Sequence, residues 1–137
     1  MAKVVVIKGD PNAGKTTATR YVLETLLLGG GVLKNFTKLA KNPMKGDFES
    51  VVEIGGKTIA ICSRGDLLKC MEGNIQKYIN CDVIVVTSRN FSTFGKAINN
   101  VYHPEVFSKF ITGANLAVNY MDLADFVRQV VAEVLKH

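Results

Sequence analysis

An eight-residue segment near the N-terminus combines two glycines with a lysine and a hydroxyl side chain: Gly9-Asp10-Pro11-Asn12-Ala13-Gly14-Lys15-Thr16. The glycines permit backbone angles and a close approach that a side chain would block. The N–H groups of such a loop point inward and form a nest for an anion. Lys15 can reach the β and γ phosphates of a nucleotide, and the Thr16 hydroxyl can ligate Mg²⁺. The segment therefore predicts a site for a nucleoside triphosphate and its magnesium ion.

The flanking sequence predicts a strand before this loop and a helix after it. Residues 4–7 are a continuous β-branched run, which suits a strand buried on both faces of a parallel sheet. Residues 14–28 carry apolar side chains at helical spacing, and a run of three glycines then ends the helix. Such a helix directs the positive end of its dipole at the bound phosphates. Residues 9–17, Thr17 included, are thus expected to contact the nucleotide.

The pattern G-x-x-x-x-G-K-[ST] in a strand–loop–helix setting resembles the Walker A motif of the P-loop NTPase superfamily. The match is specific over about the first 30 residues of the chain. The resemblance implies a three-layer P-loop NTPase fold, in which helices flank a mainly parallel sheet, and it implies ATP and Mg²⁺ as cofactors. Lys15 is then expected to be catalytic as well as phosphate-binding.

P-loop proteins usually hold Mg²⁺ or its waters with an acidic group that directly follows several apolar residues of a second strand. Here residues 58–61 lead into Cys62-Ser63-Arg64-Gly65-Asp66, so the acid is displaced into a loop. Asp66 is the candidate for Mg²⁺ coordination or general-base catalysis, and it equally suits the N-cap of the next helix. Asp82 lies at the opposite end of a strand and is expected to be a turn residue.

A third set of polar residues follows the apolar run at residues 83–86, which ends at Thr87-Ser88-Arg89-Asn90. Ligands bind beyond the carboxyl ends of strands in open α/β sheets. Arg89 is therefore a candidate catalytic residue that stabilises charge on a transferred phosphoryl group, and Arg64 is a second candidate. Residues 88–102 are polar and carry Lys96, which predicts a mobile lid. The alternative is an ordered surface loop with its phenylalanines packed in the core.

The remaining pattern alternates strands with helices and predicts a single α/β domain over residues 1–137. Gly55-Gly56 between two β-rich runs predicts an antiparallel hairpin at residues 48–62. A closing helix is expected from Asp122, its N-cap, because apolar residues recur beyond it at helical spacing. Further strands are expected at residues 31–36 and 115–120, helices at 66–79 and 104–111, and a loop at 38–46.

Composition and charge narrow the classes of partner. The net charge of +5 favours anionic ligands, and the absence of long runs of like charge favours small phosphorylated ligands over nucleic acid. No apolar stretch approaches the ~20 residues of a membrane span, and residues 4–7 are too short for a signal peptide. The three cysteines, Cys62, Cys70 and Cys81, lack C-x-x-C spacing. Free thiols in a reducing cytoplasm are therefore expected.

Three functions fit the resemblance to P-loop proteins. The preferred one is an ATP-dependent phosphotransferase, similar to small P-loop kinases, with a small molecule or a nucleotide as acceptor. The second is a nonenzymatic or regulatory ATP-binding or ATPase module that acts on a partner. The third is a Ras-like GTPase switch, because the predicted hairpin before an acidic loop looks like part of that family. The guanine-reading Asn-Lys-x-Asp motif is missing from the sequence, however.

Overall fold

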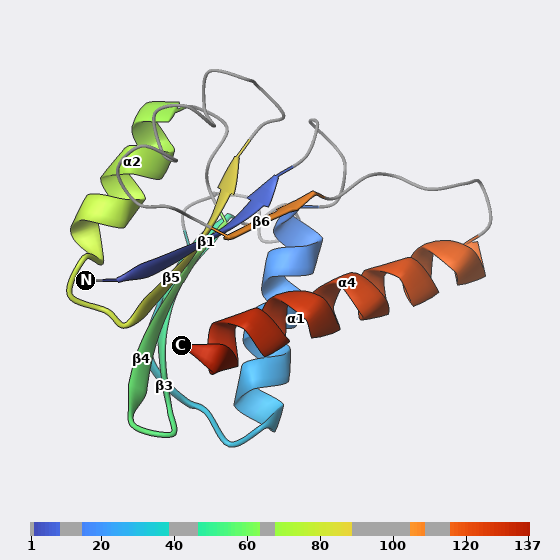
Figure 1. The fold of residues 1–137 in the computed structure, drawn as a ribbon, viewed down its shortest axis with the longest axis horizontal. Helices are drawn as coiled ribbons and strands as arrows, with labels where there is room; N and C mark the ends of the chain where they lie inside the picture. Colours follow the sequence, from blue (N-terminus) through green and yellow to red (C-terminus); the bar gives the residue numbers. More distant parts are fainter. Residues whose placement is uncertain (1, 9–14, 39–46, 64–67, 89–104, 109–115) are drawn as a thin grey trace.

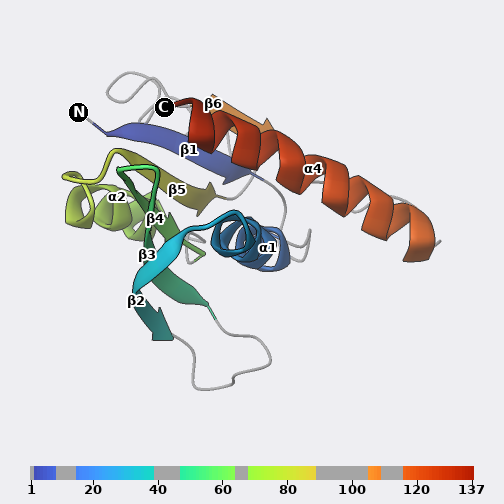
Figure 2. The ribbon, with the colours of Figure 1, turned by 90° about the horizontal axis from the view of Figure 1, so that it is seen from below.

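The computed structural model describes residues 2–8, 15–38, 47–63, 68–88, 105–108 and 116–137. These residues form a six-stranded mixed sheet with helices on both faces (Figures 1 and 2). The strand order is β2-β3-β4-β5-β1-β6. In chain order the elements are β1 (Lys3–Lys8), α1 (Lys15–Leu28), β2 (Val32–Lys38), β3 (Phe48–Ile54), β4 (Lys57–Cys62), α2 (Leu68–Lys77), β5 (Val83–Ser88), β6 (Glu105–Ser108) and α4 (Leu116–Lys136).

The parallel part of the sheet consists of β4, β5, β1 and β6. In this part, Lys8 at the end of β1 pairs with Ser88 of β5 on one side and with Ser108 of β6 on the other. In Figure 1 the arrowheads of β1 and β5 accordingly point to the same edge of the molecule. The antiparallel strands β3 and β2 extend the sheet beyond β4. The carboxyl ends of the parallel strands thus meet at one edge, which the chain reaches just before α1.

The side chains of β1 point alternately into two apolar cores, one on each face of the sheet. Val5 and Ile7 pack in the larger core under α1 and α4, whereas Val4 and Val6 pack in the smaller core under α2. All four side chains are at most 4% exposed. Figure 2 shows α2 on one face and α1 with α4 on the other. The predictions of a doubly buried strand and of helices on both faces are therefore confirmed.

Three glycines end α1, as the sequence predicts. The Gly31 N–H donates to the Leu26 carbonyl at 2.9 Å, and the Gly30 N–H donates to the Leu27 carbonyl at 3.2 Å. Gly30 has a φ of 101°, which side-chain-bearing residues rarely adopt. This pair of bonds satisfies carbonyls that the end of a helix otherwise leaves unpaired. The chain then turns into β2, an edge strand whose seven residues are all exposed.

The hairpin predicted at residues 48–62 is formed by β3 and β4. Its turn residues Gly55 and Gly56 have φ values of 56° and 79°, as a two-residue hairpin turn of the type favoured by the strand twist requires. The turn sets a register in which Glu49 pairs with Cys62. The start of β3 therefore lies beside the end of β4, at the same edge as the end of β1.

The C-terminal part of the chain differs from the sequence prediction. Residues 105–108 form strand β6, parallel to β1, although a helix was expected at 104–111. Residues 115–120 were expected as a strand, but α4 begins at Leu116, so Asp122 lies inside this helix and is not its N-cap. The apolar spacing of α4 continues upstream of Asp122 without a break. Pairing with β1 overrides the local propensity at 105–108, because strand preference depends on tertiary context.

The apolar face predicted for the closing helix is largely confirmed. Val127, Val130 and Val134 are at most 5% exposed and pack in the larger core, while Leu135 is 44% exposed. The Leu135 carbonyl at the end of α4 accepts a hydrogen bond from Lys57 Nζ at 3.1 Å. Among the helices that the structure describes, none combines the length and the apolar character needed to cross a membrane.

Glu49 is a buried carboxylate that ties β3 to α2. It is 7% exposed, and its Oε2 accepts hydrogen bonds from Lys77 Nζ and Tyr78 OH, each at 2.6 Å. Burial by itself raises the pKa of Glu49, but the hydrogen bonds from Lys77 and Tyr78 and the Lys77 charge outweigh it, so the pKa lies below 4.5. The ionised carboxylate therefore stabilises the folded protein.

Two glycines give opposite predictions for alanine substitution. A Cβ on Gly73, inside α2, would meet nothing within 4 Å, so Gly73→Ala should raise the free energy of unfolding by about 0.5–1 kcal/mol. A Cβ on Gly31 would lie 2.7 Å from the Leu26 carbonyl oxygen and 2.8 Å from Val52 Cγ1. Gly31→Ala should lower the free energy of unfolding by about 1–3 kcal/mol. Urea unfolding followed by circular dichroism measures both, and a stabilising Gly31→Ala would contradict the packing described.

Glu49→Gln is expected to lower the free energy of unfolding by about 1–3 kcal/mol at pH 7, the scale of hydrogen bonds to a buried charged group. The contribution of Glu49 to the free energy of unfolding is complete above the ordinary pKa of 4.5. It is lost as the pH falls through the lower pKa that Glu49 has in the folded protein. The difference between wild type and variant should therefore shrink below pH 4.5. Urea unfolding at several pH values measures it, with Glu53→Gln, a half-exposed residue of the same strand, as control. A difference independent of pH would contradict the assignment.

Candidate functional site

The residues that the sequence assigns to the phosphate site are described only in part. Lys15 and Thr16 begin α1, and Thr17 is exposed one position later. Residues 9–14 lie outside the described residues, as do Arg64, Asp66 and Arg89, and the Lys15 side chain is not described either. What the structure describes is therefore the start of α1 and the strand ends around it.

The Thr16 side chain meets a carboxylate that the sequence analysis did not single out. Thr16 Oγ1 donates a hydrogen bond to Asp47 Oδ1 at 3.3 Å, across 31 positions of the chain. Asp47 is half-buried and immediately precedes β3. A contact between the first turn of α1 and the residue before β3 places this carboxylate at the edge of the sheet where α1 begins.

Ser63, the residue directly after β4, connects Asp47 to the sheet. Its hydroxyl lies 3.3 Å from Asp47 Oδ1 and 3.3 Å from the Phe48 carbonyl oxygen, and its single proton can be given to either acceptor. The same hydroxyl oxygen accepts the Phe48 N–H at 2.8 Å. The Ser63 N–H donates to the Phe48 carbonyl at 3.0 Å. Ser63 thus bonds to both the N–H and the carbonyl of Phe48, and these bonds fix the backbone next to Asp47.

A fourth polar side chain extends these contacts to β5. Thr87 Oγ1 donates to the Ser63 carbonyl at 2.8 Å, and both residues are at most 4% exposed. Thr87 and Ser88 belong to β5, so this strand is two residues longer than predicted and the expected lid at 88–102 cannot begin at Ser88. Residues 89–102 lie outside the described residues. Hydrogen bonds thus run from β5 through Ser63 and Asp47 to the start of α1.

The donor chemistry of the Thr16–Asp47–Ser63 cluster suits a magnesium ion bound with phosphate. Mg²⁺ prefers hard oxygen ligands and is usually held by one or two carboxylates together with phosphate oxygens and water. A threonine hydroxyl and a carboxylate lie 3.3 Å apart here, longer than the about 2.5–3.0 Å of ordinary O–H···O bonds. Within the part of the chain that the structure describes, the hydroxyls of Thr16 and Ser63 both contact Oδ1 of Asp47. The residues present therefore fit a magnesium site.

The other described acids near these strands have structural contacts. Glu49, two residues beyond Asp47, is bound to Lys77 and Tyr78 under α2. Asp82 lies before β5 at the opposite edge, and its Oδ2 accepts the Thr58 N–H at 2.9 Å, which confirms the prediction of a turn residue. Among the described residues, no group of three or more histidine, cysteine or acidic side chains could hold a metal ion.

Sequence analysis missed Asp47 because it sought an acid after a parallel strand. Asp47 precedes an antiparallel strand instead. In a hairpin the start of the first strand lies beside the end of the second, so the predicted hairpin already implied that Asp47 is near Ser63. The hairpin register was the information that could have identified it.

Cys62 and Cys81, the two cysteines whose side chains the structure describes, do not form a nucleophilic centre. Cys62 is fully buried, and burial raises its pKa to about 12, with the nearby charge of Glu49 adding to the effect. Burial also raises the pKa of the partly exposed Cys81, and Asp82 adds to it. Both thiols are free, as the sequence predicts. At neutral pH they are protonated and behave as small apolar side chains.

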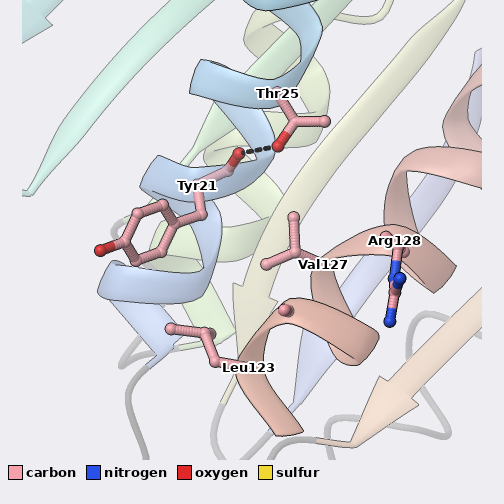
Figure 3. A pocket seen from close by; sticks show the side chains of 6 residues that line it. Tyr21, Thr25, Leu123, Val127 and Arg128 are labelled. Atoms are coloured by element: carbon pink, nitrogen blue, oxygen red, sulfur yellow. Dashed lines mark hydrogen bonds between the residues drawn. The ribbon is translucent and has the colours of Figure 1, made fainter. Parts of the chain in front are cut away.

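A groove of about 320 Å³ lies between α1 and α4 and is separate from this cluster. Figure 3 shows Tyr21 and Thr25 of α1 on one side and Leu123 and Val127 of α4 on the other. Thr25 Oγ1 donates to the carbonyl of Tyr21 at 2.7 Å, and Arg128 pairs with Asp125. The Thr25 hydroxyl and the Arg128 guanidinium are therefore already engaged, and Leu123, Ala124 and Val127 offer apolar contact.

No protein-family model, curated protein or solved structure matches this chain.

Proposed function

We propose that this chain is a P-loop protein that binds Mg-ATP and, like small P-loop kinases, transfers a phosphoryl group to a small-molecule or nucleotide acceptor. The observation that carries this proposal is the position of Lys15 and Thr16. They begin α1 directly after the loop that follows β1, and the Thr16 hydroxyl lies 3.3 Å from a carboxylate.

The arrangement of β1 and α1 supports the phosphate-binding assignment. The Walker A pattern needs a buried strand before the glycine-rich loop and a helix after it. Here β1 ends at Lys8, α1 begins at Lys15, and only residues 9–14 connect them. The first N–H groups of a helix have no partner within the helix, and the helix dipole adds positive potential there. This helix end therefore favours an anionic ligand.

The motif residues divide the work of binding a triphosphate. Lys15 would bind β and γ phosphate oxygens, and the Thr16 hydroxyl would hold the metal. Bound Mg²⁺ neutralises charge on the phosphate oxygens. The backbone of β5 ends at Ser88, opposite Lys8, so the chain that continues to Arg89 starts beside the phosphate loop. Arg89 follows Ser88, which pairs with Lys8 at the end of β1, and this sequence position is consistent with a role in stabilising the transferred phosphoryl group.

Lys15→Ala is expected to weaken Mg-ATP binding by about 10–100-fold, because hydrogen bonds to charged groups contribute about 1.5–3 kcal/mol. Isothermal titration calorimetry measures the affinity, and thermal unfolding verifies that the variant is folded. The matched control is Lys34→Ala, which removes an exposed lysine of the edge strand β2. Equal affinity in wild type and Lys15→Ala would contradict the assignment of this loop.

Turnover measurements distinguish the kinase from the other two functions. ADP release that depends on an added small-molecule or nucleotide acceptor supports phosphoryl transfer. Tight ATP binding with slow, acceptor-independent hydrolysis or with no turnover supports an ATPase or a regulatory module. Preference for GTP over ATP supports a GTPase switch, although the sequence lacks the Asn-Lys-x-Asp motif.

A further inference from the structure

We propose that the acidic group of the magnesium site is Asp47, which immediately precedes the antiparallel strand β3, and that Ser63 is its positioning residue. This inference rests on the proposed binding of Mg-ATP and deepens it. In the usual P-loop arrangement the carboxylate directly follows the apolar residues of a second parallel strand. In this chain a serine occupies that place, and the carboxylate comes from the neighbouring strand.

The strand alternation explains why Ser63 stands at the place of the missing acid. Ile59 and Ile61 of β4 pack in the larger core beneath α1. Side chains two residues apart in a strand share a face, so Ser63 continues this row at the edge where α1 begins. An acid there would meet the magnesium site directly. The Ser63 hydroxyl instead reaches Asp47 at 3.3 Å, which in turn reaches Thr16 at 3.3 Å.

The hairpin register brings Asp47 to this edge. Because β3 runs antiparallel to β4, its first residues lie beside the last residues of β4. The Ser63 N–H donates to the Phe48 carbonyl at 3.0 Å, and the Phe48 N–H donates to Ser63 Oγ at 2.8 Å, so this pair is fixed directly next to Asp47. The carboxylate therefore has a defined position without belonging to a parallel strand.

The contacts of Asp47 differ from those of Glu49, the acid two residues further along the chain. Glu49 is neutralised by Lys77 at 2.6 Å and is 7% exposed, so it has no capacity for an added cation. Asp47 is half-buried, and its contacts with Thr16 and Ser63 come from uncharged hydroxyl groups. Its negative charge thus has no cationic partner among the described residues, which suits a carboxylate that binds a divalent ion or its water shell.

The experiment measures how tightly a divalent ion binds together with ATP, independently of turnover. Electron paramagnetic resonance follows free Mn²⁺ as it is titrated into protein with ATP, and calorimetry measures ATP affinity in EDTA and in excess Mg²⁺. Asp47→Asn should lower Mn²⁺ affinity by at least about tenfold, while ATP affinity in EDTA stays equal or improves because a negative charge is removed. Ser63→Ala should lower Mn²⁺ affinity by about tenfold, the scale of lost outer-shell contacts, and Ser63→Thr should retain it.

Two comparisons make the result specific. Glu53→Gln removes a half-exposed carboxylate of the same strand that faces Lys34, and it should leave Mn²⁺ affinity unchanged. Asp66→Asn tests the competing acid in the loop after β4. If Asp66→Asn removes the Mn²⁺ dependence and Asp47→Asn does not, the proposal is overturned.

Failure of this inference can be told apart from failure of the proposed function. If wild type does not bind ATP, with or without Mg²⁺, the P-loop proposal fails and the magnesium inference fails with it. If wild type binds Mg-ATP and Lys15→Ala does not, yet Asp47→Asn binds Mn²⁺ as tightly as wild type, only the inference on Asp47 fails. If Asp47→Asn does not fold, Ser63→Ala decides: unchanged Mn²⁺ affinity in this variant overturns the proposal.

Discussion

Parallel pairing of β1 with β5 is the constraint on which the rest of the structure depends. It joins Lys8 to Ser88 and aligns the ends of both strands at one edge. Because β1 is buried on both faces, a helix must cover each face, and α1 must return across the sheet immediately after the loop. The same pairing therefore creates the two cores and places the start of α1 beside several strand ends.

The antiparallel half of the sheet has a different role. Its outer strand β2 runs in the same direction as the parallel strands and ends at the shared edge, where Lys38 pairs with Phe48, and β3 starts at this edge. Hydrogen bonds from Thr87 to Ser63, from Ser63 to Asp47 and from Thr16 to Asp47 then link β5, β4, β3 and α1. Each hydrogen bond joins groups that are close in space, yet together they connect residues from Thr16 to Thr87 of the chain. A polar network of this kind fixes side-chain positions more strongly than its separate bonds would.

Local sequence patterns predicted the elements whose structure depends on residues nearby in the sequence. The doubly buried strand at residues 4–7, the glycine end of α1 and the hairpin at 48–62 each follow from periodicity or turn chemistry within a few residues. The strand at 105–108 was missed because only its pairing with β1 makes it a strand. The early start of α4 was missed because Asp122 suits an N-cap locally although the helical spacing continues upstream.

The candidate site was predictable to the extent that it is encoded in one continuous motif. Lys15 and Thr16 were found from spacing alone, and the structure places them at the start of α1. Asp47 was not found, since it lies 31 positions from Thr16 in sequence and its proximity depends on the register of the β3–β4 hairpin. Residues whose role depends on long-range register carry no local pattern, so a motif search passes over them.

The turn at Gly55 and Gly56 lies at the far end of the hairpin from Asp47 and contacts no part of the cluster. It nevertheless determines which residue of the chain stands beside Ser63, because a shift of one position reverses the face of every side chain on β3. An inserted or deleted residue in this turn would put an acid, Asp47 or Glu49, in the place opposite Ser63 that Phe48 now occupies, and it would move the Phe48 ring to the other face of the strand. For a gene diverging by small insertions, the length of this remote turn is thus as constrained as the acid itself.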